Sequence, residues 1–101
     1  MTPDVFVIAQ LRAFEHRAQD AAAILNRLAE ATRKEPGCAA YHVVRDPAHP
    51  AHFRSIEQWR SAQAEAAHWD TDHLKRALAD LEGLLEAEAV VHKYTSIEQG
   101  G

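Results

Sequence analysis

The order of the apolar patterns along this chain constrains its fold more than any single motif does. Residues 5–12, VFVIAQLR, form a short apolar run rich in β-branched side chains, which is typical of a strand. Between positions 21 and 31, apolar residues recur at steps of three and four, as on one face of an amphipathic helix. The Glu-Pro-Gly segment 35–37 ends that helix, because proline disfavours helical geometry before it and glycine permits the turn.

Two more β-rich runs, 38–45 and 51–59, flank the segment 46–50, whose two prolines cannot donate hydrogen bonds to a sheet. A second helical pattern covers residues 60–83, and a final apolar run spans 87–97. The stripe of the second helix consists of Leu74, Ala77, Leu78 and Leu81. The order β-α-β-β-α-β predicts a ferredoxin-like α+β fold, in which helices cover one face of an antiparallel sheet.

Both faces of the predicted sheet carry apolar side chains. Odd and even positions of the first strand are both apolar, at Val5, Val7, Ala9 and Leu11 and at Phe6 and Ile8. The last strand repeats this, with Ala89 and Val91 on one side and Val90 and Tyr94 on the other. Two helices can cover only one face, so a second copy of the chain is the simplest cover for the other. We therefore expect a symmetric homodimer that forms a dimeric α+β barrel.

Length, charge and cysteine content limit the classes of function. The chain has 101 residues, so we expect a single domain over 1–101. Its net charge of −4 offers no basic surface for nucleic acid or an anionic membrane. Cys38 is its one cysteine, which indicates a reducing compartment, and the N-terminal segment does not resemble a signal peptide. We expect a cytoplasmic protein with neither nucleic-acid nor membrane partners.

The stretch HWDTDHL, residues 68–74, places two histidines around a predicted break between helices. Thr71 is a good N-cap residue, and Asp72 complements the dipole at the start of a helix. His68 then lies at the end of one short helix, and His73 in the first turn of the next. Such a corner can direct both rings at one cleft, with His73 neutral and able to accept a proton. The alternative is that His68 packs on the corner and His73 faces solvent.

Local spacing gives no metal motif. The two histidines do not form HExxH, and the chain lacks the Cys/His pairs of a zinc module. His49 and His52 lie near the hairpin turn, where most histidines are solvated. We therefore expect neither a metal nor a cofactor, and we interpret Cys38 as a buried strand residue. Glycine-rich phosphate loops, GxSxG and Walker motifs are also missing from the sequence.

The segment 35–78 resembles the antibiotic biosynthesis monooxygenase domain family. The matching features are Glu-Pro-Gly-Cys before a strand that carries Tyr41, Arg-Asp-Pro in the hairpin, Glu57-x-Trp59, and histidines at 68 and 73. Asp72 stands where many relatives have proline, and Leu74 replaces the commoner phenylalanine. The resemblance implies a dimeric α+β barrel. It covers relatives as different as cofactor-free monooxygenases of phenols and quinols, haem-degrading enzymes and a sugar-phosphate isomerase, so it does not by itself decide the chemistry.

Within this resemblance, the leading hypothesis is a cofactor-independent monooxygenase or related oxidoreductase of a small aromatic or quinol. The predicted catalytic residues are His73 as general base and His68 as the orienting group. The predicted substrate-binding residues are Tyr41, Glu57, Trp59 and Trp69. A non-catalytic dimeric ligand-binding or stress-response domain is the alternative. Haem degradation fits less well, because Gln10 and His68 stand where that branch has an asparagine and a tryptophan.

Overall fold

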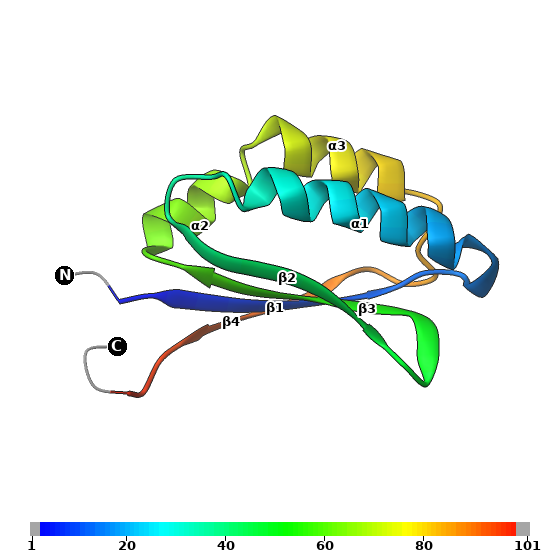
Figure 1. Cartoon of the computed structure of the whole chain (residues 1–101), viewed down its shortest axis with the longest axis horizontal. Coiled ribbons are helices and arrows are strands. Elements are labelled where there is room, and N and C mark those ends of the chain that lie inside the picture. The colour runs from blue at the N-terminus through cyan, green and yellow to red at the C-terminus, as the bar shows by residue number, and fades with distance from the viewer. Residues whose placement is uncertain (1–2, 99–101) are drawn as a thin grey trace.

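In the computed structural model, which describes residues 3–98, three α-helices lie on one face of a four-stranded antiparallel sheet (Figure 1). The elements are β1 (Val5–Arg12), a 3₁₀ turn η1 (Glu15–Arg17), α1 (Ala18–Thr32), β2 (Cys38–Asp46), β3 (His49–Trp59), α2 (Ala62–His68), α3 (Asp72–Leu81) and β4 (Val90–Thr95). The strand order is β2-β3-β1-β4, and every pairing is antiparallel. The predicted α+β, ferredoxin-like order is confirmed. None of the helices in the part of the chain described could cross a membrane.

Helix α1 follows the predicted stripe. Its buried side chains are Ala21, Ile24, Leu25, Leu28, Ala29 and Thr32. The loop after it turns at Gly37, which has φ +85°, a conformation that favours glycine. A Cβ at this position would lie 2.5 Å from the Cβ of Ala64, so glycine also lets the loop approach α2 closely. This packing brings the end of α1 next to the helical corner between α2 and α3.

The hairpin between β2 and β3 is tighter than the sequence predicts. We expected a turn over residues 46–50, but β2 runs to Asp46 and β3 already begins at His49. The side chain of Asp46 closes the turn, because its Oδ1 accepts a hydrogen bond of 2.8 Å from the backbone of Ala48. Pro50 is exposed near the start of β3, a position that tolerates a residue without an N–H group.

The core between sheet and helices consists of two groups of side chains. The larger group joins α1 and α3 to the sheet, and the smaller consists of Val7, Ala29, Tyr41 and Trp59. Three residues of the predicted α3 stripe, Leu74, Ala77 and Leu81, are buried. The fourth, Leu78, is not, because it stands at the rim of a cavity rather than inside the core.

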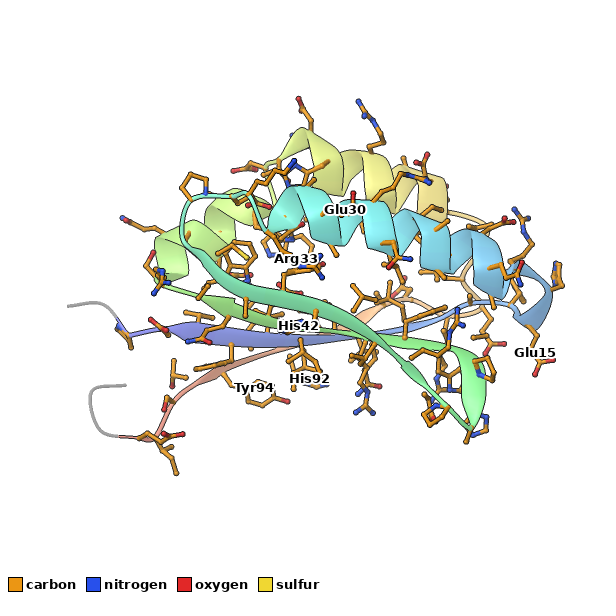
Figure 2. The ribbon with its side chains drawn as sticks, in the orientation of Figure 1. Glu15, Glu30, Arg33, His42, His92 and Tyr94 are labelled. Atoms are coloured by element: carbon orange, nitrogen blue, oxygen red, sulfur yellow. The ribbon has the colours of Figure 1, made fainter. Side chains whose placement is uncertain are left out.

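The opposite face of the sheet is open. Strand β4 is shorter than the predicted 87–97, and all of its residues are exposed. One cross-strand row consists of His42, Ile56, Ile8 and His92, paired in that order. The exposed Val44, Val90 and Tyr94 belong to neighbouring rows. Figure 2 shows His92 and Tyr94 on the side of the sheet away from the helices. This open face combines apolar side chains with imidazole rings.

Candidate functional site

The corner between α2 and α3 is fixed by one threonine. Thr71 is the N-cap of α3, as predicted, and its Oγ1 accepts a hydrogen bond of 3.3 Å from the backbone of Leu74. The same hydroxyl donates a 2.7 Å hydrogen bond to the carbonyl of His68, the last residue of α2. Thr71 therefore ties the end of one helix to the start of the next, and His68 and His73 flank this tie.

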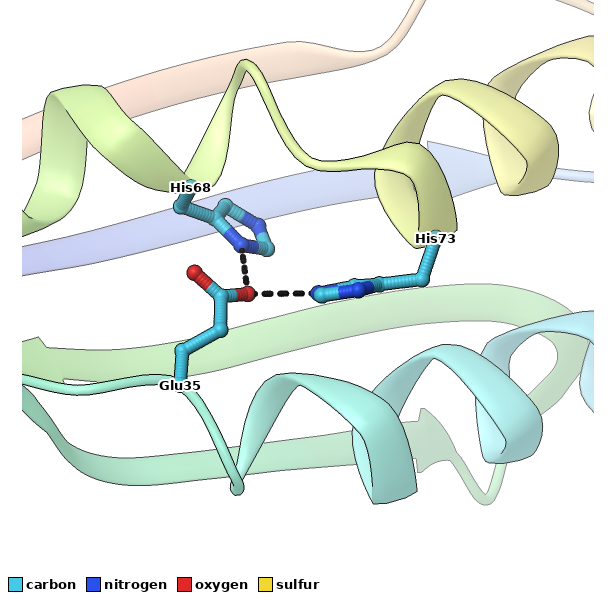
Figure 3. Close-up of side chains that lie close together, drawn as sticks. All are labelled: Glu35, His68 and His73. Atoms are coloured by element: carbon cyan, nitrogen blue, oxygen red, sulfur yellow. Dashed lines mark hydrogen bonds and ion pairs between the residues drawn. The ribbon is translucent and has the colours of Figure 1, made fainter.

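Both histidines contact the same carboxylate oxygen, Oε2 of Glu35, which lies in the loop after α1 (Figure 3). The distances are 2.6 Å from His68 Nδ1 and 2.7 Å from His73 Nε2. An ionised carboxylate only accepts hydrogen bonds, so each ring donates from the nitrogen that faces it. The side chains of His68 and Glu35 are 4% and 9% exposed, and that of His73 is 29% exposed. The three residues form a partly buried cluster, which we call the Glu35 triad.

An apolar cavity of about 60 Å³ lies between the sheet and helices α1 and α3. Most of its wall is aliphatic, from Val7, Ala9, Leu11, Leu25, Leu28, Val43, Leu74, Leu78, Leu81, Ala89 and Val91. Its polar wall consists of Tyr41, Ser55, Glu57, His68 and Trp69. A few polar groups in a mostly apolar enclosure are the usual composition of a small-molecule site.

His73 does not line this cavity. It lines a separate groove of about 170 Å³ between α1 and α3, together with Arg27, Arg76 and Asp80. The two histidines therefore converge on Glu35 and not, as the sequence suggested, on one cleft. His68 stands between Glu35 and the cavity, and His73 stands on the outer side of Glu35.

Glu57 organises the polar wall. Its Oε2 accepts a 2.6 Å hydrogen bond from the hydroxyl of Ser55, and its Oε1 accepts a 3.0 Å bond from Nε1 of Trp59. Trp59 is fully buried and is not a wall residue. Its contacts are with Glu57, the core and the ring of His68, whose centroid lies 4.8 Å away. Burial and then the charge of Glu57 raise the pKa of Tyr41. The Tyr41 hydroxyl therefore stays protonated in the ordinary pH range and can donate a hydrogen bond.

Cys38 lies beside the same carboxylates. Burial raises the pKa of its thiol first, and the charges of Glu35 and Glu57 raise it further. A thiol with a raised pKa is a poor nucleophile, because the thiolate is the reactive form. Cys38 lies at the start of β2, as predicted, but it is only half-buried rather than buried.

Trp69 closes one side of the cavity. Its Nε1 donates a 2.7 Å hydrogen bond to Oε2 of Glu65, and Nζ of Lys93 donates a 3.1 Å bond to Oε1 of the same carboxylate. Helix α2 is thereby linked to β4 across the edge of the site. The ring itself is partly exposed, at the cavity rim.

Of the predicted site residues, the structure brings Tyr41, Glu57, His68 and Trp69 to the cavity, with Trp59 behind Glu57 and His73 behind Glu35. Sequence reasoning missed Glu35, Glu65 and Lys93. Glu65 and Trp69 are four residues apart, a spacing that signals neighbours on one helix face. No local signal marks Glu35, because its partners follow 33 and 38 residues later.

Within residues 3–98, the Glu35 triad is also the one group of three or more His, Cys, Asp or Glu side chains whose ligand atoms lie close enough together to hold a metal ion. One ligand atom from each of Glu35, His68 and His73 lies within 4.8 Å of the other two. Gln10, which the haem-degrading comparison singled out, is not a wall residue of the cavity.

Comparison with known proteins gives a consistent result. The sequence model of one family, described as antibiotic biosynthesis monooxygenase, matches residues 4–80. A solved antibiotic biosynthesis monooxygenase is 28% identical, with a TM-score of 0.88 and coverage of 93% of this chain and 99% of that chain. PA3566 from Pseudomonas aeruginosa is 28% identical, with a TM-score of 0.90 and coverage of 97% and 98%.

A protein of unknown function from Bacteroides thetaiotaomicron, described as a possible oxidoreductase, is 23% identical, with a TM-score of 0.87 and coverage of 95% and 100%. At this identity the likeness concerns the fold alone. The search of curated proteins found no match.

Proposed function

Because this chain belongs to the antibiotic biosynthesis monooxygenase family, we propose that it oxidises a small phenol or quinol with O₂ and without a cofactor. A structural neighbour at 28% identity is itself described as an antibiotic biosynthesis monooxygenase, which supports oxygenase chemistry. The substrate class and the roles of individual residues are our proposal, and they rest on the geometry of the cavity.

The position of His68 carries the proposal. Its Nδ1 donates to the buried Glu35, so a neutral ring has its lone pair on Nε2. No side chain in residues 3–98 forms a hydrogen bond with that Nε2, and His68 belongs to the cavity wall. A ring held in this tautomer against an apolar enclosure can accept the proton of a phenolic hydroxyl.

The reaction balances without a further reductant. His68 takes the phenol proton, and the electron-rich phenolate adds O₂ at a ring carbon that carries hydrogen. The proton held by His68 then passes to the bound peroxide. The O–O bond breaks, the ring carbon loses its hydrogen as a proton, and water leaves. One oxygen atom of O₂ becomes the new quinone carbonyl, and the other becomes water.

We assign the base role to His68 rather than to His73, which the sequence favoured. His73 does not line the cavity, and it donates to the same oxygen that receives the His68 hydrogen bond. A second donor restrains the carboxylate, which in turn restrains the imidazole. In this proposal His73 is a positioning residue, and Tyr41 donates a hydrogen bond to an oxygen of the bound ring or of the peroxide.

Substrate entry requires the cavity to widen. Its 60 Å³ is well below the roughly 300 Å³ at the lower end of known ligand sites. Trp69, Leu78, Ala89 and Val91 are the exposed members of the wall. Trp69 and Leu78 have the longest side chains of the four, so rotation of these two enlarges the space at least cost. The Lys93–Glu65 ion pair, which holds Trp69 in place, has an exposed lysine and so contributes little stability against this movement.

The homodimer expected from the sequence is part of the proposal. Its support is the open face, where Val44, Ile56, Val90 and Tyr94 are exposed on adjacent rows of one sheet. A symmetric second copy would bury these side chains against themselves. It would also cover β4, whose Val91 lines the edge of the cavity together with Ala89, the residue just before the strand.

The test is O₂ consumption and quinone absorbance with a panel of naphthols and hydroquinones, using wild type and His68→Asn. Asparagine keeps an N–H donor near the position of Nδ1 but has no basic nitrogen, so turnover should fall about 10²–10⁴-fold, the usual value of a positioned base. His16→Ala, an exposed histidine of η1, is the matched control and should keep full turnover.

Unchanged turnover in His68→Asn would remove the base role. Saturable binding of these phenols with no O₂ consumption by the wild type would instead assign the non-catalytic ligand-binding alternative.

A further inference from the structure

Two carboxylates beside the cavity, Glu35 and Glu57, have largely buried side chains and no lysine or arginine partner within residues 3–98. The side-chain partners of Glu57 are the neutral donors of Ser55 and Trp59. Those of Glu35 are two imidazoles, and no lysine or arginine in residues 3–98 forms an ion pair with it. An uncompensated buried charge is costly, so this region favours a cation.

The negative charge of these two carboxylates also affects neighbouring titratable side chains. The charges of Glu35 and Glu57 both act to raise the pKa of Cys38 and of Tyr41, in addition to the effect of burial. The groups that feel these carboxylates lie on β2, whereas the histidines come from α2 and α3. The negative potential therefore extends through the space between helix corner and sheet.

The potential ligand atoms of the Glu35 triad are of the kinds that first-row divalent metal ions prefer. Two imidazole nitrogens and one carboxylate oxygen suit first-row divalent ions, and three protein ligands leave coordination positions for water. In a tetrahedral site with bonds of about 2.0–2.1 Å, ligand atoms lie about 3.3 Å apart. The present nitrogen–oxygen distances are 2.6 and 2.7 Å, so the Glu35 oxygen must move less than about 1 Å from each nitrogen.

We propose that the Glu35 triad is a binding site for a divalent transition-metal ion such as Zn²⁺, ligated by Glu35 Oε2, His68 Nδ1 and His73 Nε2. Both histidines stay neutral in this exchange. Each ring moves its proton from the nitrogen that binds the ion to its other nitrogen, so the divalent ion and Glu35 together carry a net charge of +1. The bound cation then neutralises the buried carboxylate and satisfies all three groups at once.

The ion has a path to this site from the outer groove. His73 is the most exposed member of the triad, with 29% of its side chain accessible, and it lines that groove between α1 and α3. Arg27 and Arg76 on the groove walls oppose the approach of a cation, while Asp80 favours it. All three are exposed and therefore strongly screened at physiological ionic strength, so they affect the rate of entry more than the affinity.

A bound ion also changes the cavity side of His68. With Nδ1 on the metal, the proton resides on Nε2, so the ring offers a donor where the ion-free ring offers an acceptor. This consequence rests on the proposed function: the ion-loaded protein would not act as a base at His68. Metal binding itself does not depend on that function and is measured without a substrate.

The experiment titrates Co²⁺ and Zn²⁺ into the full chain after dialysis against EDTA, with calorimetry for affinity and visible absorbance for Co²⁺ geometry. We expect one ion per chain and the intense absorbance of tetrahedral Co²⁺. His73→Ala and Glu35→Gln should each weaken binding at least about 100-fold, because loss of an outer partner alone costs about 10–100-fold. His73 is partly exposed, so its alanine variant should fold even if Glu35→Gln does not.

The control removes the other histidine pair. His49 and His52 have ring centroids 4.9 Å apart on the exposed hairpin and could chelate an ion adventitiously. The double variant His49→Ala/His52→Ala should keep both stoichiometry and affinity. Absence of binding in the wild type, or binding lost in the hairpin variant and kept in His73→Ala, overturns the proposal. If the wild type binds no ion, the ring N–H groups of His68 and His73 are sufficient to satisfy the Glu35 carboxylate.

Discussion

The two faces of the sheet reverse the usual relation between burial and polarity along β3. Ser55 and Glu57, which face the helices, are only 3% and 7% exposed, whereas the apolar Ile56 between them is 44% exposed. Strands of a one-sided sheet normally place apolar residues inside and polar ones outside. The buried polar residues are satisfied by hydrogen bonds and form the wall of a cavity, and the exposed apolar residue lies in a row that spans the sheet.

The two faces of β3 therefore indicate two different roles for the sheet. A polar pair costs stability in a core unless every group has a partner, so its presence indicates chemistry at that face. Exposed apolar side chains on adjacent rows of one sheet face cost solubility unless something covers them, so their presence indicates an interface. The covered face is where we place the site, and the open face is where we place the second copy.

We expect the largest effect from a substitution that disrupts the proposed dimer interface on the open face. Ile56→Asp places a charge at the centre of the proposed interface in both copies, and should weaken dimerisation at least about 100-fold, or about 2.7 kcal/mol. Leu78→Asp is the matched control, since Leu78 is 46% exposed but lies on α3. Sedimentation at low micromolar concentration should show a dimer for wild type and control and a monomer for Ile56→Asp. A wild-type monomer would disprove the interface.

The burial of Tyr41 on the covered face can be tested by measuring the stability of the protein as a function of pH. The folded state raises the pKa of Tyr41, so above about pH 10, the unfolded value, the unfolded chain releases a proton that the folded chain keeps. This contribution to stability is complete below pH 10 and is lost as the pH rises, at up to about 1.4 kcal/mol per pH unit. Urea unfolding between pH 9 and 11 should show a shallower loss of stability for Tyr41→Phe than for wild type.

Tyr94→Phe supplies the comparison for the open face. Tyr94 is exposed on β4 of the single chain, so Tyr94→Phe is made in the Ile56→Asp background, where the open face is uncovered, and should leave the alkaline loss of stability of that background unchanged. Equal slopes for Tyr41→Phe and wild type would show that the buried hydroxyl is not the group that titrates.

The sequence predicts the architecture well, because the signals for strands and helices are local. The β-rich run at 5–12, the stripe of α1 and the Thr71 cap are all features of a few adjacent residues, and all are confirmed. The hairpin turn was wrong because two prolines suggested an irregular segment, whereas the side chain of Asp46 closes a tighter turn. A hydrogen bond from the backbone to one particular side chain cannot be inferred from amino-acid composition.

The site was predicted only in part, because its hydrogen bonds join distant segments. Spacing correctly separated His68 and His73 onto two helices, but their common partner is Glu35, from a loop that the sequence marks only as a helix end. A test for metal motifs based on local spacing cannot find three ligands brought together by packing. Likewise, Trp59 was expected at the ligand, and its full burial behind Glu57 follows from strand direction and packing, which short motifs do not encode.

The smallest expected effect concerns the corner that gives the covered face its geometry. Thr71→Ala and Ser61→Ala each remove an N-cap, of α3 and α2 respectively, and each should lower the free energy of unfolding by about 1 kcal/mol. Only Thr71 also donates to the carbonyl of His68, so only its loss should move the His68 ring relative to Glu35. Imidazole NMR resonances of His68 and His73 should therefore shift in Thr71→Ala and stay in place in Ser61→Ala, at equal loss of stability. Thr71→Ser, which keeps the hydroxyl, should restore the resonances. Shifts of the same size in both alanine variants would mean that the cap stabilises the helix without setting the position of the histidines.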